Sequence, residues 1–143
     1  RGERFEESTF EIWGGYGAGL FDEVARYAIA CAEIAKQHDF DLVHAHDWQA
    51  AMVPAYLRFA QVKGARSVPS VITIHNMAFQ GYFDAGVFPK LGLPKAAWSV
   101  DGVESYGGVG FLKAGMQSAD AITTVSPTYA GEIRSTEFGM GLE

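Results

Sequence analysis

Three short apolar stretches of the chain each end abruptly in polar side chains. They cover residues 40–44, 68–74 and 121–125. Apolar runs of this length are typical of strands buried on both faces, as in a parallel sheet. The first leads into His46 and Asp47, the second stops at His75, and the third stops at Ser126. We therefore predict three parallel strands whose polar carboxyl ends lie along one edge of a sheet.

Between these strands, hydrophobic residues recur at helical spacing. The predicted helices cover residues 20–38, 48–59, 110–118 and 127–135. Asp47 is placed to cap the second helix, and Pro54 should kink or divide it because proline has no N–H to donate. Ser126 as cap and Pro127 at the first helical position mark the start of the last helix. This alternation predicts an α/β fold with a doubly wound parallel sheet and right-handed crossovers.

Residues 76–107 break the alternation. The segment is rich in glycine and carries six aromatic side chains: Phe79, Tyr82, Phe83, Phe88, Trp98 and Tyr106. A loop of this length inside a compact domain is usually a lid or a binding loop. Exposed aromatic rings in such a loop suit sugar rings. We expect about half of the six to form a small core beneath the loop instead.

Composition narrows the class of protein. The 143 residues are 48% hydrophobic, which fits one domain with a packed core, and the net charge is −6. Lysine and arginine form no run, so we expect no nucleic-acid partner. No apolar stretch is long enough for a membrane span, and Cys31 is the only cysteine. We expect a cytoplasmic protein without membrane contact. The start at Arg1 suggests a piece of a longer protein.

The polar strand ends form the candidate site. If the strands are parallel, their ends bring together side chains that are far apart in sequence: His44, His46, Asp47, Trp48, His75 and Asn76. We expect His44 and His46 to point to opposite sides of their strand, so that one of them is structural. A metal-dependent hydrolase is one interpretation, because imidazoles and a carboxylate can bind zinc. However, the sequence offers no further metal ligands at a clear spacing.

Four motifs in order resemble bacterial glycogen and starch synthases. They are His-Ala-His-Asp-Trp at 44–48, Thr-Ile-His-Asn-Met-Ala-Phe-Gln-Gly at 73–81, Gly-Phe-Leu-Lys-Ala-Gly at 110–115 and Thr-Val-Ser-Pro-Thr-Tyr-Ala at 124–130. The resemblance covers the chain from about residue 40 to its end. Any one motif is weak evidence, whereas four in the right order are specific.

The resemblance implies a retaining glycosyltransferase with two Rossmann-like domains, the GT-B architecture. Such enzymes transfer glucose from ADP-glucose, sometimes UDP-glucose, to the non-reducing end of an α-1,4-glucan, and the resemblance implies no metal or other cofactor. Residues 1–143 would form the latter part of the amino-terminal, acceptor-side domain. The donor diphosphate contacts of the family are absent, so we expect this chain alone to be inactive, or to act only as a glucan-binding module.

The resemblance also implies roles for individual residues. His75 matches the active-site histidine of the family, which contacts the donor sugar and whose backbone carbonyl faces the anomeric carbon. Asp47 is the second predicted catalytic residue. The predicted substrate-binding residues are His46, Trp48, Asn76, Phe79 and Lys113. Tyr106 departs from the family, since several relatives carry asparagine there, in the sequence Phe-Asn-Gly.

Overall fold

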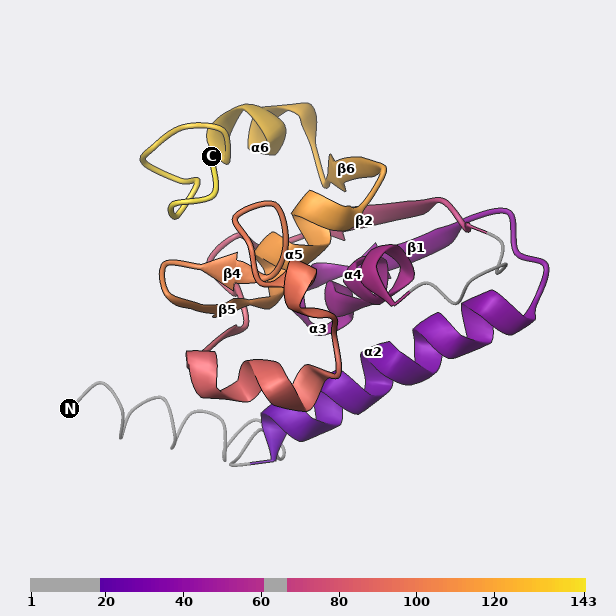
Figure 1. Cartoon of the computed structure of the whole chain (residues 1–143). Coiled ribbons are helices and arrows are strands. Elements are labelled where there is room, and N and C mark those ends of the chain that lie inside the picture. Colours follow the sequence, from indigo (N-terminus) through magenta and orange to yellow (C-terminus); the bar gives the residue numbers. More distant parts are fainter. Residues whose placement is uncertain (1–18, 61–66) are drawn as a thin grey trace.

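A computed structural model describes residues 19–60 and 67–143. Its centre is a parallel sheet of β1 (Val43–His46), β2 (Ser70–Ile74) and β6 (Ala121–Thr124), in the order β1-β2-β6 (Figure 1). In register, His46 lies opposite Thr73, and Ile74 lies opposite Thr124. The carboxyl ends of the strands therefore meet at one edge, as predicted, and the α/β class is confirmed.

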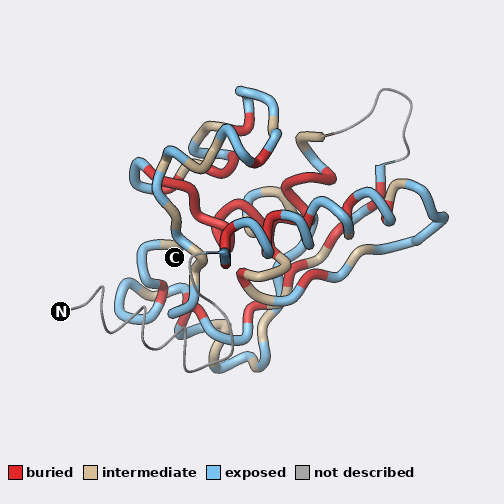
Figure 2. The backbone as a smooth tube through the Cα atoms, turned by 90° about the horizontal axis from the view of Figure 1, so that it is seen from below, coloured by how far each residue is buried: buried red, intermediate tan, exposed pale blue. Residues whose placement is uncertain are grey.

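The helices occur where the periodicity predicts them. They are α2 (Leu20–Gln37), α3 (Asp47–Ala50), α4 (Met52–Phe59), α5 (Phe111–Ser118) and α6 (Pro127–Glu132). α4 packs against both α2 and α5, and the residues between them form the buried centre of the molecule (Figure 2). No helix within residues 19–60 and 67–143 is long and apolar enough to cross a membrane.

β1 begins later than the apolar pattern indicates. Phe40 and Leu42 were expected in the strand, but they precede it and are 45% and 50% exposed. The neighbouring strand explains this shift. Pro69 has no N–H to donate, so the regular ladder starts with Val43 opposite Ser70, next to the bond from the Val43 N–H to the Pro69 carbonyl at 2.9 Å.

The turn after β1 differs from the predicted helix cap. Asp47 is the first residue of α3 and has a left-handed backbone, with φ 58°. No side chain caps this helix, because the Asp47 carboxylate is engaged by His75 instead. The expected division of the helix is confirmed: α3 ends at Ala50 and α4 starts at Met52. Pro54 explains the break, since it cannot donate to the Ala50 carbonyl.

The start of α6 agrees with the sequence. The Ser126 hydroxyl accepts from the Tyr129 N–H at 3.0 Å, and Pro127 is the first residue of the helix. The helix ends at Glu132, three residues before the predicted end.

Residues 76–107 hold more regular structure than predicted. A second sheet, antiparallel in the order β3-β5-β4, is built from β3 (Tyr82–Phe83), β4 (Glu104–Ser105) and β5 (Gly108–Gly110), and two 3₁₀ helices, η1 (Ala85–Leu91) and η2 (Lys95–Ala97), lie between β3 and β4. Strands of two or three residues are too short for a periodic signal. The aromatic side chains divide as expected into a packed group, Phe83, Phe88 and Trp98, and an exposed group, Phe79, Tyr82 and Tyr106.

Candidate functional site

Asp47 and His75 join the carboxyl ends of β1 and β2. One carboxylate oxygen of Asp47 accepts from the His75 backbone N–H at 2.7 Å, and the other lies 3.0 Å from the ring Nδ1. The left-handed backbone of Asp47 turns its side chain toward the neighbouring strand instead of along its own helix. The two residues predicted to be catalytic are therefore in direct contact.

This contact assigns distinct roles to the two nitrogens of the His75 ring. Because Nδ1 faces a carboxylate, it carries the proton in the neutral ring, and Nε2 on the opposite side is then a hydrogen-bond acceptor. The His75 side chain is 47% exposed, so a ligand can reach the ring. Such an acceptor can bind a sugar hydroxyl.

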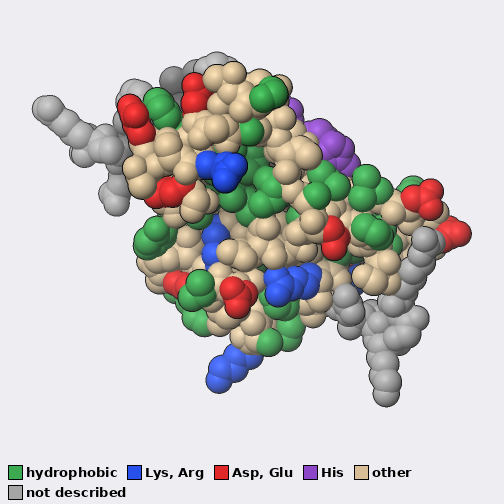
Figure 3. Space-filling model, turned by 90° about the horizontal axis from the view of Figure 1, so that it is seen from above, with side chains coloured by type: hydrophobic (Ala, Val, Ile, Leu, Met, Phe, Trp, Pro, Cys, Tyr) green, Lys and Arg blue, Asp and Glu red, His purple; other side chains and the backbone are tan. Residues whose placement is uncertain are grey.

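Three histidine rings form a row at the end of the sheet. The ring centroids of His44 and His46 are 4.2 Å apart, and those of His46 and His75 are 5.4 Å apart. The expectation that His44 and His46 point to opposite sides was wrong. Residues two apart in a strand share a face, and both side chains are exposed. Histidine side chains are visible at the surface in Figure 3.

Hydrogen bonds connect the His44 ring, on β1, to β2 and through it to β6. His44 Nε2 lies 2.6 Å from the Thr73 hydroxyl, which lies 2.7 Å from the Thr123 hydroxyl. Sequence reasoning did not select the two threonines. The one available signal was their position at the ends of predicted strands, because their contacts depend on strand order.

The segment after His75 is fixed by hydrogen bonds. The Asn76 side-chain oxygen accepts from the Ala78 N–H at 2.9 Å, and the Met77 N–H donates to the Tyr129 hydroxyl at 2.9 Å. Asn76 therefore shapes the turn, and its amide nitrogen is left for a ligand. Tyr129 was missed from sequence, since its partner is 52 residues away.

Trp48 lies in the core and Phe79 at the surface. The Trp48 side chain is 7% exposed, and its ring centroid is 6.3 Å from those of both Phe83 and Phe111. Phe79 is 62% exposed. The structure therefore gives Trp48 a packing role, and substrate contact by either residue stays a prediction.

Lys113 lies in the interior, where it holds a turn. Its amine donates to the carbonyls of Ser99, Val100 and Gly102. Burial lowers the pKa of the Lys113 amine from its usual value, and the charges of Glu104 and Asp101 act in the opposite direction. Substrate contact by Lys113 stays a prediction, because its hydrogen bonds already serve the fold.

We expect Lys113→Met to lower the free energy of unfolding by about 2 kcal/mol, because the buried Gly102 carbonyl and two partly buried carbonyls lose a charged donor. Methionine retains most of the side-chain volume, so the hydrogen bonds are the main change. Denaturant unfolding of the chain measures the effect, with Lys90→Met at an exposed position as the control. Equal stability of the two variants would show that Lys113 does not hold the turn.

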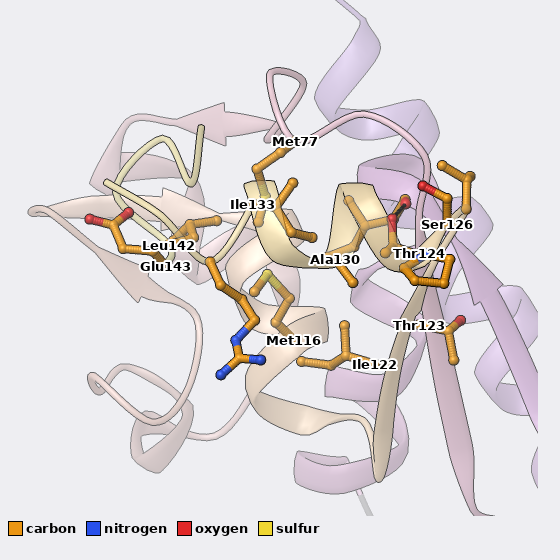
Figure 4. A pocket seen from close by; sticks show the side chains of 14 residues that line it. Met77, Met116, Ile122, Thr123, Thr124, Ser126, Ala130, Ile133, Leu142 and Glu143 are labelled. Carbon is orange, nitrogen blue, oxygen red and sulfur yellow. Dashed lines mark hydrogen bonds between the residues drawn. The ribbon is translucent and has the colours of Figure 1, made fainter. Parts of the chain in front are cut away.

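The hollow drawn in Figure 4 lies between β6, α5 and α6 and has a volume of about 530 Å³. The side chains of Met116, Ala130 and Ile133 point into it. Neither Asp47 nor His75 lines this hollow. Its lining mixes apolar side chains with polar ones, among them Ser126, Arg134 and Glu143. The candidate chemistry is assigned to the Asp47–His75 pair, because the residues predicted to be catalytic meet there.

Residues 19–60 and 67–143 contain no group of three or more His, Cys, Asp and Glu side chains arranged to hold a metal ion. In the histidine row, the His44 ring is hydrogen-bonded to the Thr73 hydroxyl, and Asp47 accepts a hydrogen bond from the His75 backbone N–H. The arrangement serves hydrogen bonding, which does not favour the hydrolase interpretation.

Known proteins resemble this chain over most of its length. The starch synthase catalytic domain matches residues 6–143. The glycogen synthase of Novosphingobium aromaticivorans is 66% identical over 146 aligned positions, covering 99% of this chain and 29% of that protein. Glycogen synthase 1 of Rhizobium meliloti is 54% identical, with 86% and 26% covered.

A solved structure shows the same fold. The catalytic domain of starch synthase IV from Arabidopsis thaliana, bound to ADP and acarbose, superposes with a TM-score of 0.74 at 32% identity. The match covers 83% of this chain and 26% of that one. This chain thus spans less than a third of the length of the proteins it resembles.

Proposed function

This chain belongs to the starch synthase catalytic-domain family, and from that premise we propose that it forms part of a retaining glucosyltransferase. The reaction is transfer of glucose from ADP-glucose to the non-reducing end of an α-1,4-glucan, in the cytoplasm. The chain forms the latter part of the acceptor-side domain. In the proposed enzyme, the second Rossmann-like domain of the GT-B architecture holds the donor diphosphate.

The observation that carries this proposal is the contact between Asp47 and His75. The hydrogen bond from the His75 N–H to Asp47 fixes the backbone of His75, and the 3.0 Å contact between Asp47 and the ring Nδ1 positions the ring. In the proposed reaction the His75 carbonyl faces the anomeric carbon, which becomes positively charged in an oxocarbenium-like transition state. A carbonyl dipole that is already oriented stabilises this charge without reorganisation.

The remaining residues of the site have supporting roles. His75 Nε2 accepts from a donor-sugar hydroxyl, and the Asn76 amide donates to another. His46 lies beside the His75 ring and lines the sugar site. Phe79, exposed in the turn after β2, contacts the acceptor.

Transfer of radiolabelled glucose from ADP-glucose to glycogen tests the proposal. We expect the complete enzyme that contains this segment to transfer glucose, and the pure 143-residue chain to show none, because half of the cleft and the diphosphate contacts are missing. Excess chelator should leave the rate unchanged, since cationic side chains and helix termini can stabilise the leaving diphosphate without a metal.

Three results would contradict the proposal. Transfer by the 143-residue chain alone would show that it is not part of a larger cleft. Absence of transfer from both ADP-glucose and UDP-glucose by the complete enzyme would refute the activity. Loss of activity in excess chelator would support a metal-dependent reaction at His44, His46 and Asp47.

A further inference from the structure

The peptide group between His75 and Asn76 makes no hydrogen bond, whereas the peptide groups on both sides of it are held. Neither the His75 carbonyl nor the Asn76 N–H has a hydrogen-bond partner among residues 19–60 and 67–143. The ladder between β2 and β6 ends one residue earlier, at Ile74 and Thr124. The His75 carbonyl is therefore left available at the carboxyl edge of the sheet.

The peptide group before it is held at both ends. The Ile74 carbonyl accepts from the Thr124 hydroxyl at 2.6 Å. The His75 N–H donates to the Asp47 carboxylate at 2.7 Å. These bonds come from β6 and from the start of α3, so two neighbouring elements determine the direction in which β2 ends.

The peptide group after it is held by Tyr129. The Tyr129 hydroxyl accepts from the Met77 N–H at 2.9 Å. In the described part of the chain, this is the one hydrogen bond that joins residues 76–79 to a distant segment, since their other bonds link positions two or three apart. Tyr129 is itself fixed in α6, because its N–H donates to the Ser126 hydroxyl at 3.0 Å and its ring packs against the core.

These anchors restrain the direction of the His75 carbonyl because peptide groups are planar. Only two soft backbone rotations, one in His75 and one in Asn76, set the orientation of the peptide group between them. Asp47 and Thr124 hold the preceding group, and Tyr129 holds the following one. Loss of the Tyr129 bond frees the following group and lets the His75 carbonyl turn.

We propose that Tyr129 is a positioning residue for glucose transfer. Through its bond to the Met77 N–H, it holds the His75 carbonyl in the direction required at the anomeric carbon. This inference rests on the proposed function, in which that carbonyl stabilises developing positive charge. A dipole stabilises a transition state best when it is oriented before the reaction. Tyr129 acts through the backbone and not on the substrate, so its hydroxyl serves turnover more than ground-state binding.

Tyr129→Phe in the complete enzyme tests this role, because phenylalanine keeps the packed ring and removes only the hydroxyl. We expect kcat to fall about tenfold, the effect of one lost hydrogen bond. KM for ADP-glucose and for glycogen should stay nearly unchanged. Steady-state kinetics measure kcat and KM, and thermal unfolding measures the melting temperature of each variant.

Tyr56→Phe is the matched control. The Tyr56 hydroxyl makes a buried bond of 2.6 Å to the Leu91 carbonyl, which holds the end of η1 and not the segment after His75. This variant should lower the melting temperature at least as much as Tyr129→Phe does, and it should leave kcat unchanged. The comparison separates positioning from a general loss of stability.

Amide hydrogen exchange in the complete enzyme gives a readout that needs no activity. We expect faster exchange over residues 75–77 in Tyr129→Phe than in the unaltered enzyme, because the Met77 N–H loses its acceptor. Tyr56→Phe should leave exchange over the same residues unchanged.

Three results would overturn the proposal. They are a kcat of Tyr129→Phe equal to that of the unaltered enzyme, an equal fall in kcat in Tyr56→Phe, and unaltered exchange over residues 75–77 in Tyr129→Phe. Failure of the proposed function is distinguishable from all three, because the unaltered enzyme itself would then transfer no glucose.

Discussion

In the complete enzyme, His75→Ala should lower kcat by about 10²–10³-fold, which corresponds to about 2–4 kcal/mol of transition-state stabilisation. In the proposed reaction, the His75 ring contributes a hydrogen bond to the donor sugar in the geometry required for transfer. Loss of such a contact affects turnover more than ground-state binding. Steady-state kinetics with ADP-glucose and glycogen measure kcat and KM separately.

The fold should tolerate this change. The His75 side chain is 47% exposed, and Asp47 also accepts from the His75 backbone N–H, which the substitution leaves in place. The melting temperature should therefore change little. His38→Ala, at an exposed histidine just after α2, should leave both activity and stability unaltered. Phe79→Ala should mainly change acceptor use.

Two results would refute the assignment of His75. One is a kcat close to that of the unaltered enzyme. The other is a loss of activity that follows the loss of folded protein, since a purely structural histidine would affect both together.

The second large effect should come from Gly81→Ala, which we expect to lower the free energy of unfolding by about 3 kcal/mol or more. Gly81 has φ 60°, and an added Cβ would lie 2.3 Å from the Trp48 ring. Trp48 is buried beside Phe83 and Phe111 and cannot move away without disturbing them. Denaturant unfolding of the chain measures the loss.

Gly92→Ala is a matched control for the backbone conformation. Gly92 has φ 65°, and no atom lies within 4 Å of an added Cβ. Its substitution should cost about 1 kcal/mol, from the left-handed backbone alone. The difference between the two variants reports the clash with Trp48. Equal losses would show that Trp48 is free to move, which would strengthen its predicted role in substrate binding.

Patterns within a few residues of the sequence predicted the positions of helices. Helical spacing located α2 and α5 to within one residue at each end, and Ser126 with Pro127 marked the start of α6. The period of two in a strand also determined that His44 and His46 share a face. The sequence contained this information, although we expected the opposite.

Local sequence could not determine the partners of individual side chains. From sequence, Asp47 was equally suited to cap a helix or to bind a distant group. Because β2 lies beside β1, its carboxylate binds His75, which is 28 residues away. The sequence alone is compatible with a surface position for Lys113. Its burial depends on the turn at residues 99–102, whose carbonyls accept from its amine. Both outcomes depend on contacts between segments that no local pattern encodes.

The sequence by itself determined the α/β class, the parallel strands and the residues at their carboxyl ends, because hydrophobic periodicity and turn chemistry act within a few residues. Only the tertiary structure decided which of these residues touch. The pairing of β1 with β2 joins Asp47 to His75, and the short strands β3, β4 and β5 place Tyr106 beside Gly141. Such contacts form when distant segments pack, so their partners are chosen by the shape of the whole core.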